Sequence, residues 1–402
     1  MVASGRVGVF GMIYDVIVVG VGGMGSAACW QLARRGERVL GLERFDIPHA
    51  MGSSHGVSRI IRLPYYEDPA YVPLLHRAYA LWRELEAATG EEVLVLTGSV
   101  DAGPEDDPVF QGALASARLH GLAHEVLTGA GVNERFPGYR LPAAHRAVFQ
   151  PQGGLVASER AIVAHVRAAQ AEGAEIHARE RVLGWEARPG GEGVVVRTDK
   201  GRHEAARLVL TAGAWMADLA APLAGLAVPE RQVLAWLQPH RPELFARERS
   251  PVFNLQVEEG RYYGFPIYEV PGFKFGRYHH RGEACAADAM RREPDAEDER
   301  LLRAFAARYF PEGCGPTMAL RACLFTNTPD EHFVLDRHPE HPQVVLASPC
   351  SGHGYKFCSA IGEVLADMAT GDGATRHDVA FLRLDRPALR RPAPRPAAPV
   401  GA

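Results

Sequence analysis

Three lysines stand out in a chain that otherwise takes its positive charge from arginine. Of its 44 Lys and Arg residues, only Lys200, Lys274 and Lys356 are lysine. An ammonium group is compact and its pKa shifts readily, so lysines that survive such a bias are enriched at sites that need these properties. Lys200 lies in a Thr-Asp-Lys-Gly turn and is expected at the surface. Lys274 and Lys356 lie in segments rich in glycine and aromatic residues, where functional and structural roles are both open.

The cysteines indicate neither a disulfide framework nor a zinc site. They are scattered and contain no Cys-x-x-Cys pair: Cys29, Cys285, Cys314, Cys323, Cys350 and Cys358. This pattern favours a reducing, cytoplasmic compartment, and no metal is expected. An isolated cysteine is most often a small core residue, so Cys323 by itself indicates no site.

A glycine-rich turn near the start of the chain has the spacing of a dinucleotide-binding site. An apolar run over residues 14–19 predicts a buried strand, and a helical stretch over 26–35 follows the turn. Between them, Gly20 allows a tight turn, Gly22 lets the backbone approach a pyrophosphate, and Gly25 lets helix and strand pack closely. The diphosphate would lie at the helix N-terminus, where free N–H groups and the helix dipole attract anions.

An acidic residue completes this pattern. A second predicted strand, residues 38–43, ends at Glu43, about 20 residues after the first glycine. Its carboxylate is expected to accept a hydrogen bond from the adenosine ribose. The alternative is an ordinary strand–helix–strand turn that binds no ligand.

Length and composition limit the class of protein. A chain of 402 residues predicts two domains. The net charge of -4 gives no electrostatic case for nucleic acid or an anionic membrane. No uncharged apolar stretch of about 20 residues is present, and none is expected to span a bilayer. Residues 1–13 do not have the pattern of a signal peptide, and Met12 is an alternative start.

The order of predicted elements indicates an α/β protein with two interleaved domains. Helices are predicted over 70–89, 158–172, 295–309 and 354–370. Strands are predicted within 93–100, 175–182, 193–197 and 207–215, and the alternation over 230–280 predicts an antiparallel sheet. We therefore expect a discontinuous Rossmann-like nucleotide-binding domain (12–92, 152–225 and 323–385), an antiparallel-sheet substrate domain (93–151 and 226–322) and a disordered tail (386–402).

Several further motifs occur in an order that resembles one flavoprotein family. They are 53–56 with Arg59 and Arg62, 211–215, 263–266, 272–276, 323–330 and 351–357. Together with the fingerprint, they resemble the monomeric sarcosine oxidase / N-methyltryptophan oxidase family over about residues 12–385. The segments 323–330 and 351–357 are the specific ones, since many flavin and nicotinamide enzymes share the fingerprint.

The resemblance implies FAD as the cofactor, covalently attached as a thioether through Cys323. His55 is expected to pack beside the flavin, with a purely structural histidine as an equal alternative, and Arg59 is expected to face the flavin. The N–H groups of the glycine-rich segment 351–357 are expected to stabilise negative charge on the reduced flavin. The further cofactor-binding residues that it implies are Arg44, Ser53, Val182, Thr326, Gly352 and Gly354.

The same resemblance implies a substrate site. Arg62 and Lys356 would bind the substrate carboxylate, although a salt bridge is the default role of an arginine such as Arg62. Tyr263 would line the amine pocket, and Lys274 would promote the reaction with oxygen. The family's histidine four residues after that lysine is replaced by Tyr278, which leaves open whether His279 has its role.

The resemblance thus implies a monomeric oxidase of secondary amino acids that yields an imine and hydrogen peroxide. Two alternatives remain: a flavin dehydrogenase that passes electrons to a carrier, and a catalytically idle nucleotide-binding module. Sarcosine, N-methyltryptophan and pipecolate are all possible substrates.

Overall fold

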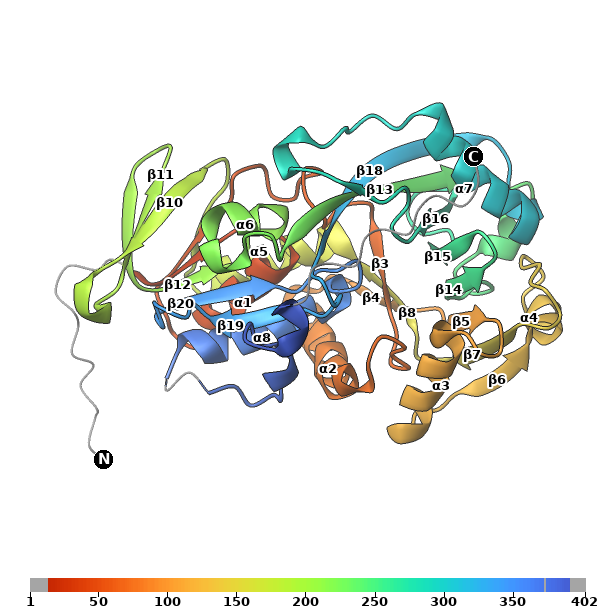
Figure 1. Cartoon of the computed structure of the whole chain (residues 1–402), viewed down its shortest axis with the longest axis horizontal. Coiled ribbons are helices and arrows are strands. Elements are labelled where there is room, and N and C mark those ends of the chain that lie inside the picture. Colours follow the sequence, from red (N-terminus) through yellow and green to blue (C-terminus); the bar gives the residue numbers. More distant parts are fainter. Residues whose placement is uncertain (1–13, 372–373, 391–402) are drawn as a thin grey trace.

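The computed structural model describes residues 14–371 and 374–390. Two large sheets with their helices lie side by side along the long axis of the molecule, as Figure 1 shows. The fold is therefore the α/β architecture with a second sheet that the sequence predicts.

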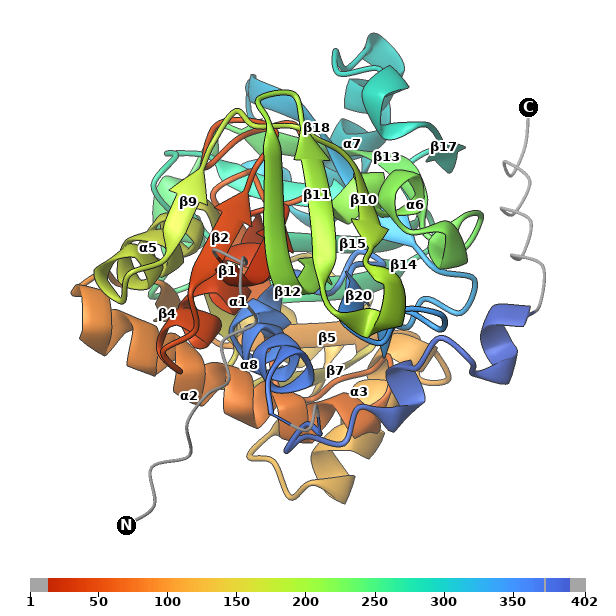
Figure 2. The ribbon, with the colours of Figure 1, turned by 90° about the vertical axis from the view of Figure 1, so that its left-hand side faces the viewer.

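The first sheet is centred on the predicted fingerprint strand. In the described part of the chain it has eight strands: β1 (Tyr14–Val19), β2 (Val39–Leu42), β9 (Glu175–His177), β10 (Val182–Ala187), β11 (Val194–Thr198), β12 (Arg202–Leu210), β19 (Val334–Arg337) and β20 (Val344–Ser348). β1 pairs in parallel with β2 and β12, and β12 with β20. The antiparallel strands β10 and β11 extend from β12 and face the viewer in Figure 2.

Helices rich in small residues cover one face of this sheet. α1 (Gly23–Ala33), α5 (Ser158–Ala171) and α8 (Cys358–Ala369) contact its strands, and α2 (Val72–Thr89) packs outside them against α5 and α8. α1 is buried almost along its whole length between its neighbours. A Cβ added at Gly362 of α8 would lie 2.6 Å from the Ala27 backbone carbon of α1. Alanine and glycine are therefore needed here, because larger side chains would push the two helices apart.

The second sheet is almost entirely antiparallel. Its nine strands in the described residues are β5 (Ser99–Gly103), β6 (Glu125–Thr128), β7 (Arg146–Gln150), β13 (Val228–Leu237), β14 (Val252–Val257), β15 (Gly260–Phe265), β16 (Phe273–Arg277), β17 (Glu283–Ala284) and β18 (Thr317–Asn327). Its core is aromatic, with Phe253, Phe273 and Phe310 packed together beside Phe305 of α7 (Ala296–Tyr309). The other helices are α3 (Pro108–Leu119), α4 (Gly129–Arg135) and α6 (Met216–Leu219).

A small third sheet carries one of the predicted arginines. It consists of β3 (Ser58–Ile61), β8 (Gly154–Ala157) and β4 (Leu94–Leu96). Arg59 lies on β3, and Arg62 follows the end of that strand.

Some predicted limits differ from the structure. The expected limit between 322 and 323 falls inside β18, which is one continuous strand of the second sheet, so Cys323 and Thr326 belong to that sheet. Residues 386–390, which were expected to belong to a disordered tail, pack against the fold, because Arg386 binds the Asp330 carboxylate at 2.7 Å and Leu389 is buried. Residues 391–402 lie outside the described residues, as does Met12. The domain division itself stays a prediction.

Neither disulfides nor membrane-spanning helices occur among the described residues. All six cysteines are free. Across the described ranges, none of the helices has the length and hydropathy that crossing a membrane requires.

Candidate active site

A cavity of about 300 Å³ lies at the end of β1 and extends to the second sheet. Thirteen residues predicted to bind cofactor or substrate are among those that line it: Gly20, Gly22, Glu43, Arg44, Ser53, Arg59, Arg62, Val182, Tyr263, Cys323, Gly352, Gly354 and Lys356. Tyr278, which stands where the family has a histidine, lines it too. Gly25, His55, Lys274, His279 and Thr326 do not line it. The cavity thus brings together residues from distant parts of the sequence.

The fingerprint glycines have the geometry that a bound dinucleotide requires. Gly20 has a φ of +90°, and a Cβ there would lie 2.6 Å from the Thr211 carbonyl oxygen. A Cβ at Gly25 would lie 1.8 Å from the Gly20 carbonyl oxygen, which explains the close contact of α1 with β1. At Gly22 a Cβ would meet only Ser54 Oγ, at 3.6 Å, so the backbone is open toward the cavity. The residues present therefore fit the diphosphate of FAD.

We expect Gly25→Ala to remove cofactor binding and destabilise the fold. The new methyl group would overlap the Gly20 carbonyl, so α1 would have to move away from β1, at a cost of about 1–3 kcal/mol or more. Thermal unfolding and the flavin content of the purified protein check this. Gly201→Ala is the matched control, since a Cβ at Gly201 meets nothing within 4 Å. Equal flavin content in both variants would contradict the prediction.

Glu43 lies at the end of β2 with its carboxylate at the cavity wall. Its Oε2 accepts a hydrogen bond from the Val21 amide at 2.9 Å, and its Oε1 accepts one from the Phe45 amide at 3.0 Å. Burial raises the pKa of Glu43, against the effect of these amide donors. Each carboxylate oxygen retains a second lone pair, so the group can still accept from ribose hydroxyls.

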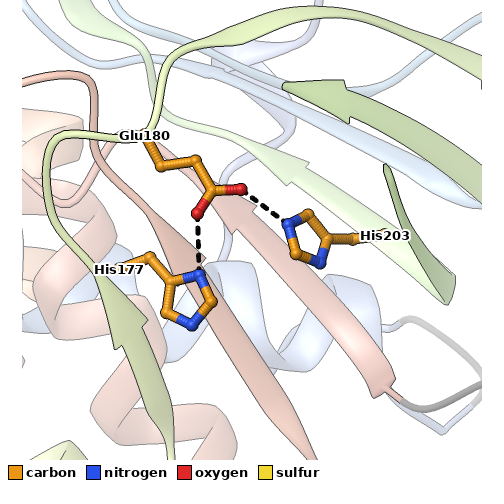
Figure 3. Close-up of side chains that lie close together, drawn as sticks. All are labelled: His177, Glu180 and His203. Atoms are coloured by element: carbon orange, nitrogen blue, oxygen red, sulfur yellow. Dashed lines mark hydrogen bonds and ion pairs between the residues drawn. The ribbon is translucent and has the colours of Figure 1, made fainter. Parts of the chain in front are cut away.

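A histidine–glutamate network is hydrogen-bonded to the backbone of Glu43. Glu180 accepts hydrogen bonds from both imidazoles, with 2.9 Å to His177 Nδ1 and 2.7 Å to His203 Nε2, and Figure 3 shows it between the two rings. The Glu43 amide donates to the His177 carbonyl, and the Glu180 amide donates to the Glu43 carbonyl. The network therefore fixes the backbone on both sides of Glu43.

The same three side chains are the place where a metal ion could be held. Their donor atoms lie within 4.8 Å of one another, and no other such group of three occurs in the described part of the chain. The two ring nitrogens point to different oxygens of Glu180, however, and His177 Nε2 lies 2.6 Å from Glu175. Hydrogen bonds thus already use the atoms that would bind a metal.

The loop that precedes β3 carries Ser53 and His55, and Arg59 follows on β3 itself. The Arg59 guanidinium donates to the carbonyls of Ser53, His55 and Ser58, while its Cζ lies 5.9 Å from the ring centre of Tyr355. Glu159 accepts from the amides at the Gly56–Val57 turn. These contacts hold the loop in one conformation and leave Arg59 at the cavity wall.

Cys323 lies on β18 with its thiol against this loop. Its Sγ is 3.8 Å from Arg59 Nη2 and 3.9 Å from the Ser53 carbonyl. Burial acts to raise the pKa of Cys323, but the neighbouring His55 and Arg59 outweigh it and lower the pKa to about 7. His55 itself is buried, and its Nε2 has no hydrogen-bond partner in the described structure. Cys323 is therefore a thiol that ionises readily at the edge of the cavity.

Lys274 lies behind the cavity wall. Its Nζ donates to the carbonyls of Gly56 and Ser58, at 2.6 and 2.7 Å, and lies 4.1 Å from the ring centre of Phe265. Burial and the nearby Arg59 lower the pKa of Lys274 well below its ordinary value. The lysine thus touches the same loop as Arg59 and His55, within an apolar environment.

Arg62 and Lys356 both line the cavity and both lie beside the Tyr65 ring, and two carboxylates that the sequence analysis missed surround Arg62. Arg62 Nη2 donates to Glu67 at 2.9 Å, and Arg62 Nε lies 3.1 Å from Asp101. Lys356 Nζ donates to the His353 carbonyl at 2.6 Å and lies 3.5 Å from Tyr65 Oη. Burial and the adjacent Arg62 lower the pKa of Lys356 to about 7.

Tyr278, and not His279, lies at the cavity. His279 turns away and binds Glu230 at 3.1 Å and Glu331 at 3.0 Å. These carboxylates outweigh its burial and raise the pKa of His279 to about 9, so it is a charged link between surface elements. β16 ends at Arg277, and His279 has a φ of +55°, so the chain turns directly after Tyr278 and carries the histidine away from the cavity.

The segment before α8, residues 349–356, forms a further wall of the cavity. Gly352 has a φ of +75°, and a Cβ at Gly354 would lie 1.7 Å from the Pro349 carbonyl oxygen. A 3₁₀ turn, Tyr355–Phe357, precedes α8, so the α-helix begins four residues later than the predicted 354. Thr326 lies beneath this segment, where its carbonyl accepts from the Ser351 amide at 2.9 Å.

The sequence matches the family described as FAD dependent oxidoreductase, DAO, over residues 15–368. The chain belongs to this family, and it is an FAD-dependent oxidoreductase. The glycine cradle and the position of Glu43 agree with that cofactor.

Curated relatives resemble the chain over nearly their whole length. Monomeric sarcosine oxidase of Streptomyces avermitilis is 41% identical over 377 residues, which cover 92% of this chain and 96% of the relative. Monomeric sarcosine oxidase of Bacillus sp. (strain B-0618) is 39% identical, with 94% and 97% covered. N-methyl-L-tryptophan oxidase of Yersinia pestis is 36% identical, with 93% and 100% covered.

Solved structures agree with the fold. NikD, an unusual amino acid oxidase essential for nikkomycin biosynthesis, matches with a TM-score of 0.80 and 26% identity over 92% of this chain and 97% of that one. L-proline dehydrogenase from P. horikoshii matches with a TM-score of 0.80 and 22% identity, over 93% and 97% of the two chains, and shows the fold alone.

Proposed function

We propose that the chain is an FAD-dependent oxidase of secondary amino acids, with N-methyl amino acids such as sarcosine or N-methyltryptophan as substrates. The products are the imine, which hydrolyses to aldehyde and amine, and hydrogen peroxide. The observation that carries the proposal is the cavity that joins a dinucleotide cradle to the buried cations Lys356 and Arg62. The names of the relatives support it.

Some residues of this chain would bind the cofactor and others would bind the substrate. Bound FAD supplies the oxidising group that accepts a hydride from the carbon next to nitrogen. Lys356 and Arg62 would bind the substrate carboxylate, and Tyr263 would line the amine pocket. The sulfur of Cys323 would hold the flavin as a thioether, which prevents its loss. Arg44 and Val182 would contact the adenosine end.

Lys356 is the stronger candidate for the carboxylate contact. Glu67 and Asp101 already balance the charge of Arg62, and Arg62 in turn lowers the pKa of Glu67 to about 2 despite burial. The hydrogen bonds of Lys356 go to a carbonyl and a phenol oxygen, which leaves its charge available to a ligand. We therefore assign the larger part of the binding energy to Lys356.

We expect Lys356→Gln to weaken binding of a carboxylate inhibitor such as methylthioacetate by about 10–150-fold. The reason is the loss of a charge-assisted hydrogen bond, which contributes about 1.5–3 kcal/mol. Titration of the flavin absorbance gives the Kd. Because the Lys356 pKa is about 7, the parent's affinity falls as the pH rises through 7, and the variant loses this dependence. An unchanged Kd in the variant would place the carboxylate elsewhere.

Arg62→Lys is the conservative comparison. Arg62→Gln would leave two buried carboxylates without their cation, and its effect on folding would obscure any effect on binding. Arg62→Lys keeps the charge and loses the bidentate geometry to Glu67.

The test of the function is a screen of N-methyl and cyclic amino acids with oxygen uptake and peroxide measured together. An oxidase forms one peroxide for each oxygen consumed. Reduction of a dye without oxygen uptake would indicate the dehydrogenase alternative, which the names of the curated relatives do not favour. A colourless protein that oxidises nothing would indicate a non-catalytic module.

We also propose that the protein is a monomer in the cytoplasm. Light scattering checks the oligomeric state, and cell fractionation checks the location.

A further inference from the structure

Arginine and tyrosine side chains alternate along one side of the cavity. The Arg62 Cζ lies 4.2 Å from the ring centre of Tyr66. The Arg261 Cζ lies 5.6 Å from the same ring and 3.7 Å from the ring centre of Tyr278. Both tyrosines line the cavity, and Arg261 lies behind them. We call Tyr66, Arg261 and Tyr278 the tyrosine–arginine wall.

Arg261 is held mainly by aromatic rings. The nearest carboxylate oxygen, in Glu331, is 4.0 Å away, and no acceptor in the described ranges takes a hydrogen bond from the guanidinium. Arg261 belongs to β15, and its carbonyl accepts from the Tyr278 amide at 2.8 Å. A cation at 3.7 Å from a ring centre is a close cation–π contact, so Arg261 fixes the position of Tyr278.

This contact alters what the wall can bind. A cation over one face of an aromatic ring draws on its π density, so the ring offers less attraction to a second cation. An electron-rich aromatic ring is then the better partner for its free surface and edge. The Tyr66 hydroxyl, which is buried and has no partner in the described structure, adds a polar group that can accept from an indole or phenol.

The wall begins beside the expected carboxylate site, because Tyr66 packs against Arg62 and lines the same cavity. A substrate whose carboxylate binds Lys356 and Arg62 has its α-carbon one bond away, and Tyr66 is the ring against Arg62. Sarcosine has no side chain there. An aromatic side chain would reach Tyr66 and Tyr278, whereas an acidic one would meet the rings and not Arg261 itself.

We propose that the tyrosine–arginine wall binds an aromatic side chain of the substrate, so that this oxidase prefers N-methyl amino acids with aromatic side chains over sarcosine and N-methylalanine. This inference rests on the proposed function. Tyr66 and Tyr278 contact the side chain, and Arg261 is a positioning residue that acts through Tyr278.

The experiment compares kcat/KM for N-methyl-L-tryptophan, N-methyl-L-phenylalanine, N-methyl-L-alanine and sarcosine, with peroxide as the readout. We expect the aromatic substrates to exceed N-methylalanine by about tenfold or more, the scale of two ring contacts. Tyr278→Leu and Tyr66→Leu should reduce this ratio by several-fold and leave the value for sarcosine within about threefold. Tyr66→Phe removes the hydroxyl and keeps the ring, so it distinguishes the contribution of one from that of the other.

Arg261→Gln tests the positioning role. It should reduce the aromatic preference by raising KM with kcat little changed, and Arg261→Lys should restore part of it. Arg277→Gln, on the neighbouring strand β16, is the matched control and should change nothing. As a readout without turnover, calorimetry should give a lower Kd for indole-3-acetate than for acetate in the parent, and a smaller difference in Arg261→Gln.

The outcomes separate the inference from the function. If sarcosine and N-methylalanine yield peroxide as efficiently as the aromatic substrates, or if the wall variants keep the parent's ratios, the inference is wrong and the proposed function stands. A preference for N-methylaspartate or N-methylglutamate would also overturn it, in favour of an anion contact with Arg261. If no N-methyl amino acid is oxidised, both are wrong.

Discussion

Denatured Cys323→Ser protein is expected to release all of its flavin into the acid supernatant, whereas the parent's precipitate stays yellow. A thioether requires the sulfur of this residue, and a serine hydroxyl is a far weaker nucleophile near neutral pH than a thiol whose pKa is about 7. Flavin absorbance in the pellet and mass analysis of the peptide with Cys323 check the result. Attachment to apoprotein should also become faster as the pH rises through 7, because the thiolate fraction then increases.

Two other cysteines at the same cavity are matched controls. Cys350 and Cys358 also line it, but burial raises the pKa of Cys350 to about 12 and that of Cys358 well above its ordinary value. Cys350→Ser and Cys358→Ser should keep the flavin attached. Release of all flavin from the parent itself would show that the attachment hypothesis is wrong.

Lys274→Met is expected to slow the reaction of the reduced enzyme with oxygen by about 100-fold, equivalent to about 2.7 kcal/mol. Reduction of oxygen begins with negative charge that forms in an apolar environment, and a nearby ammonium stabilises it. Burial holds the pKa of Lys274 low, so its charge is stabilised most when an anion forms beside it. Stopped-flow measurement should find anaerobic reduction by substrate within a few-fold of the parent.

The contacts of Lys274 allow a second explanation for a slow variant, a purely structural role, which the experiment must exclude. Because its Nζ binds the Gly56 and Ser58 carbonyls, the lysine also supports the loop that carries His55 and the start of β3, which carries Arg59. If support were its only role, flavin content and both half-reactions would decrease together in Lys274→Met. Lys200→Met, in the surface turn after β11, is the control and should behave as the parent does.

The elements that carry the cofactor were predictable because local rules fix them. The strand and glycine spacing at 14–25 predicted β1 and α1, and apolar periodicity predicted α2, α5 and α7 to within a few residues. The approach of Gly25 to Gly20 is likewise a consequence of that spacing. Membership of the flavoprotein family, predicted from the motifs, is confirmed.

What depends on contacts between distant segments was not predictable. Glu67 follows Arg62 closely, but Asp101 reaches the same guanidinium from a strand of the other sheet. The limit placed at Cys323 followed a motif, while the strand continues to Asn327 because its pairing with β13 does. The choice of Tyr278 over His279 depends on the turn that follows β16, where His279 has a φ of +55°, and no spacing in the sequence predicts that turn.

The order of the strands in the first sheet has a consequence for how the protein is made. β1 is near the beginning of the chain, yet its partner strand β12 comes after the first part of the second sheet, and β20 and α8 come after the rest of it. The first sheet and its helices are therefore complete only once α8, which ends at Ala369, has been synthesised. We expect FAD binding to follow that point, since Gly352, Gly354 and Lys356 also line the cavity.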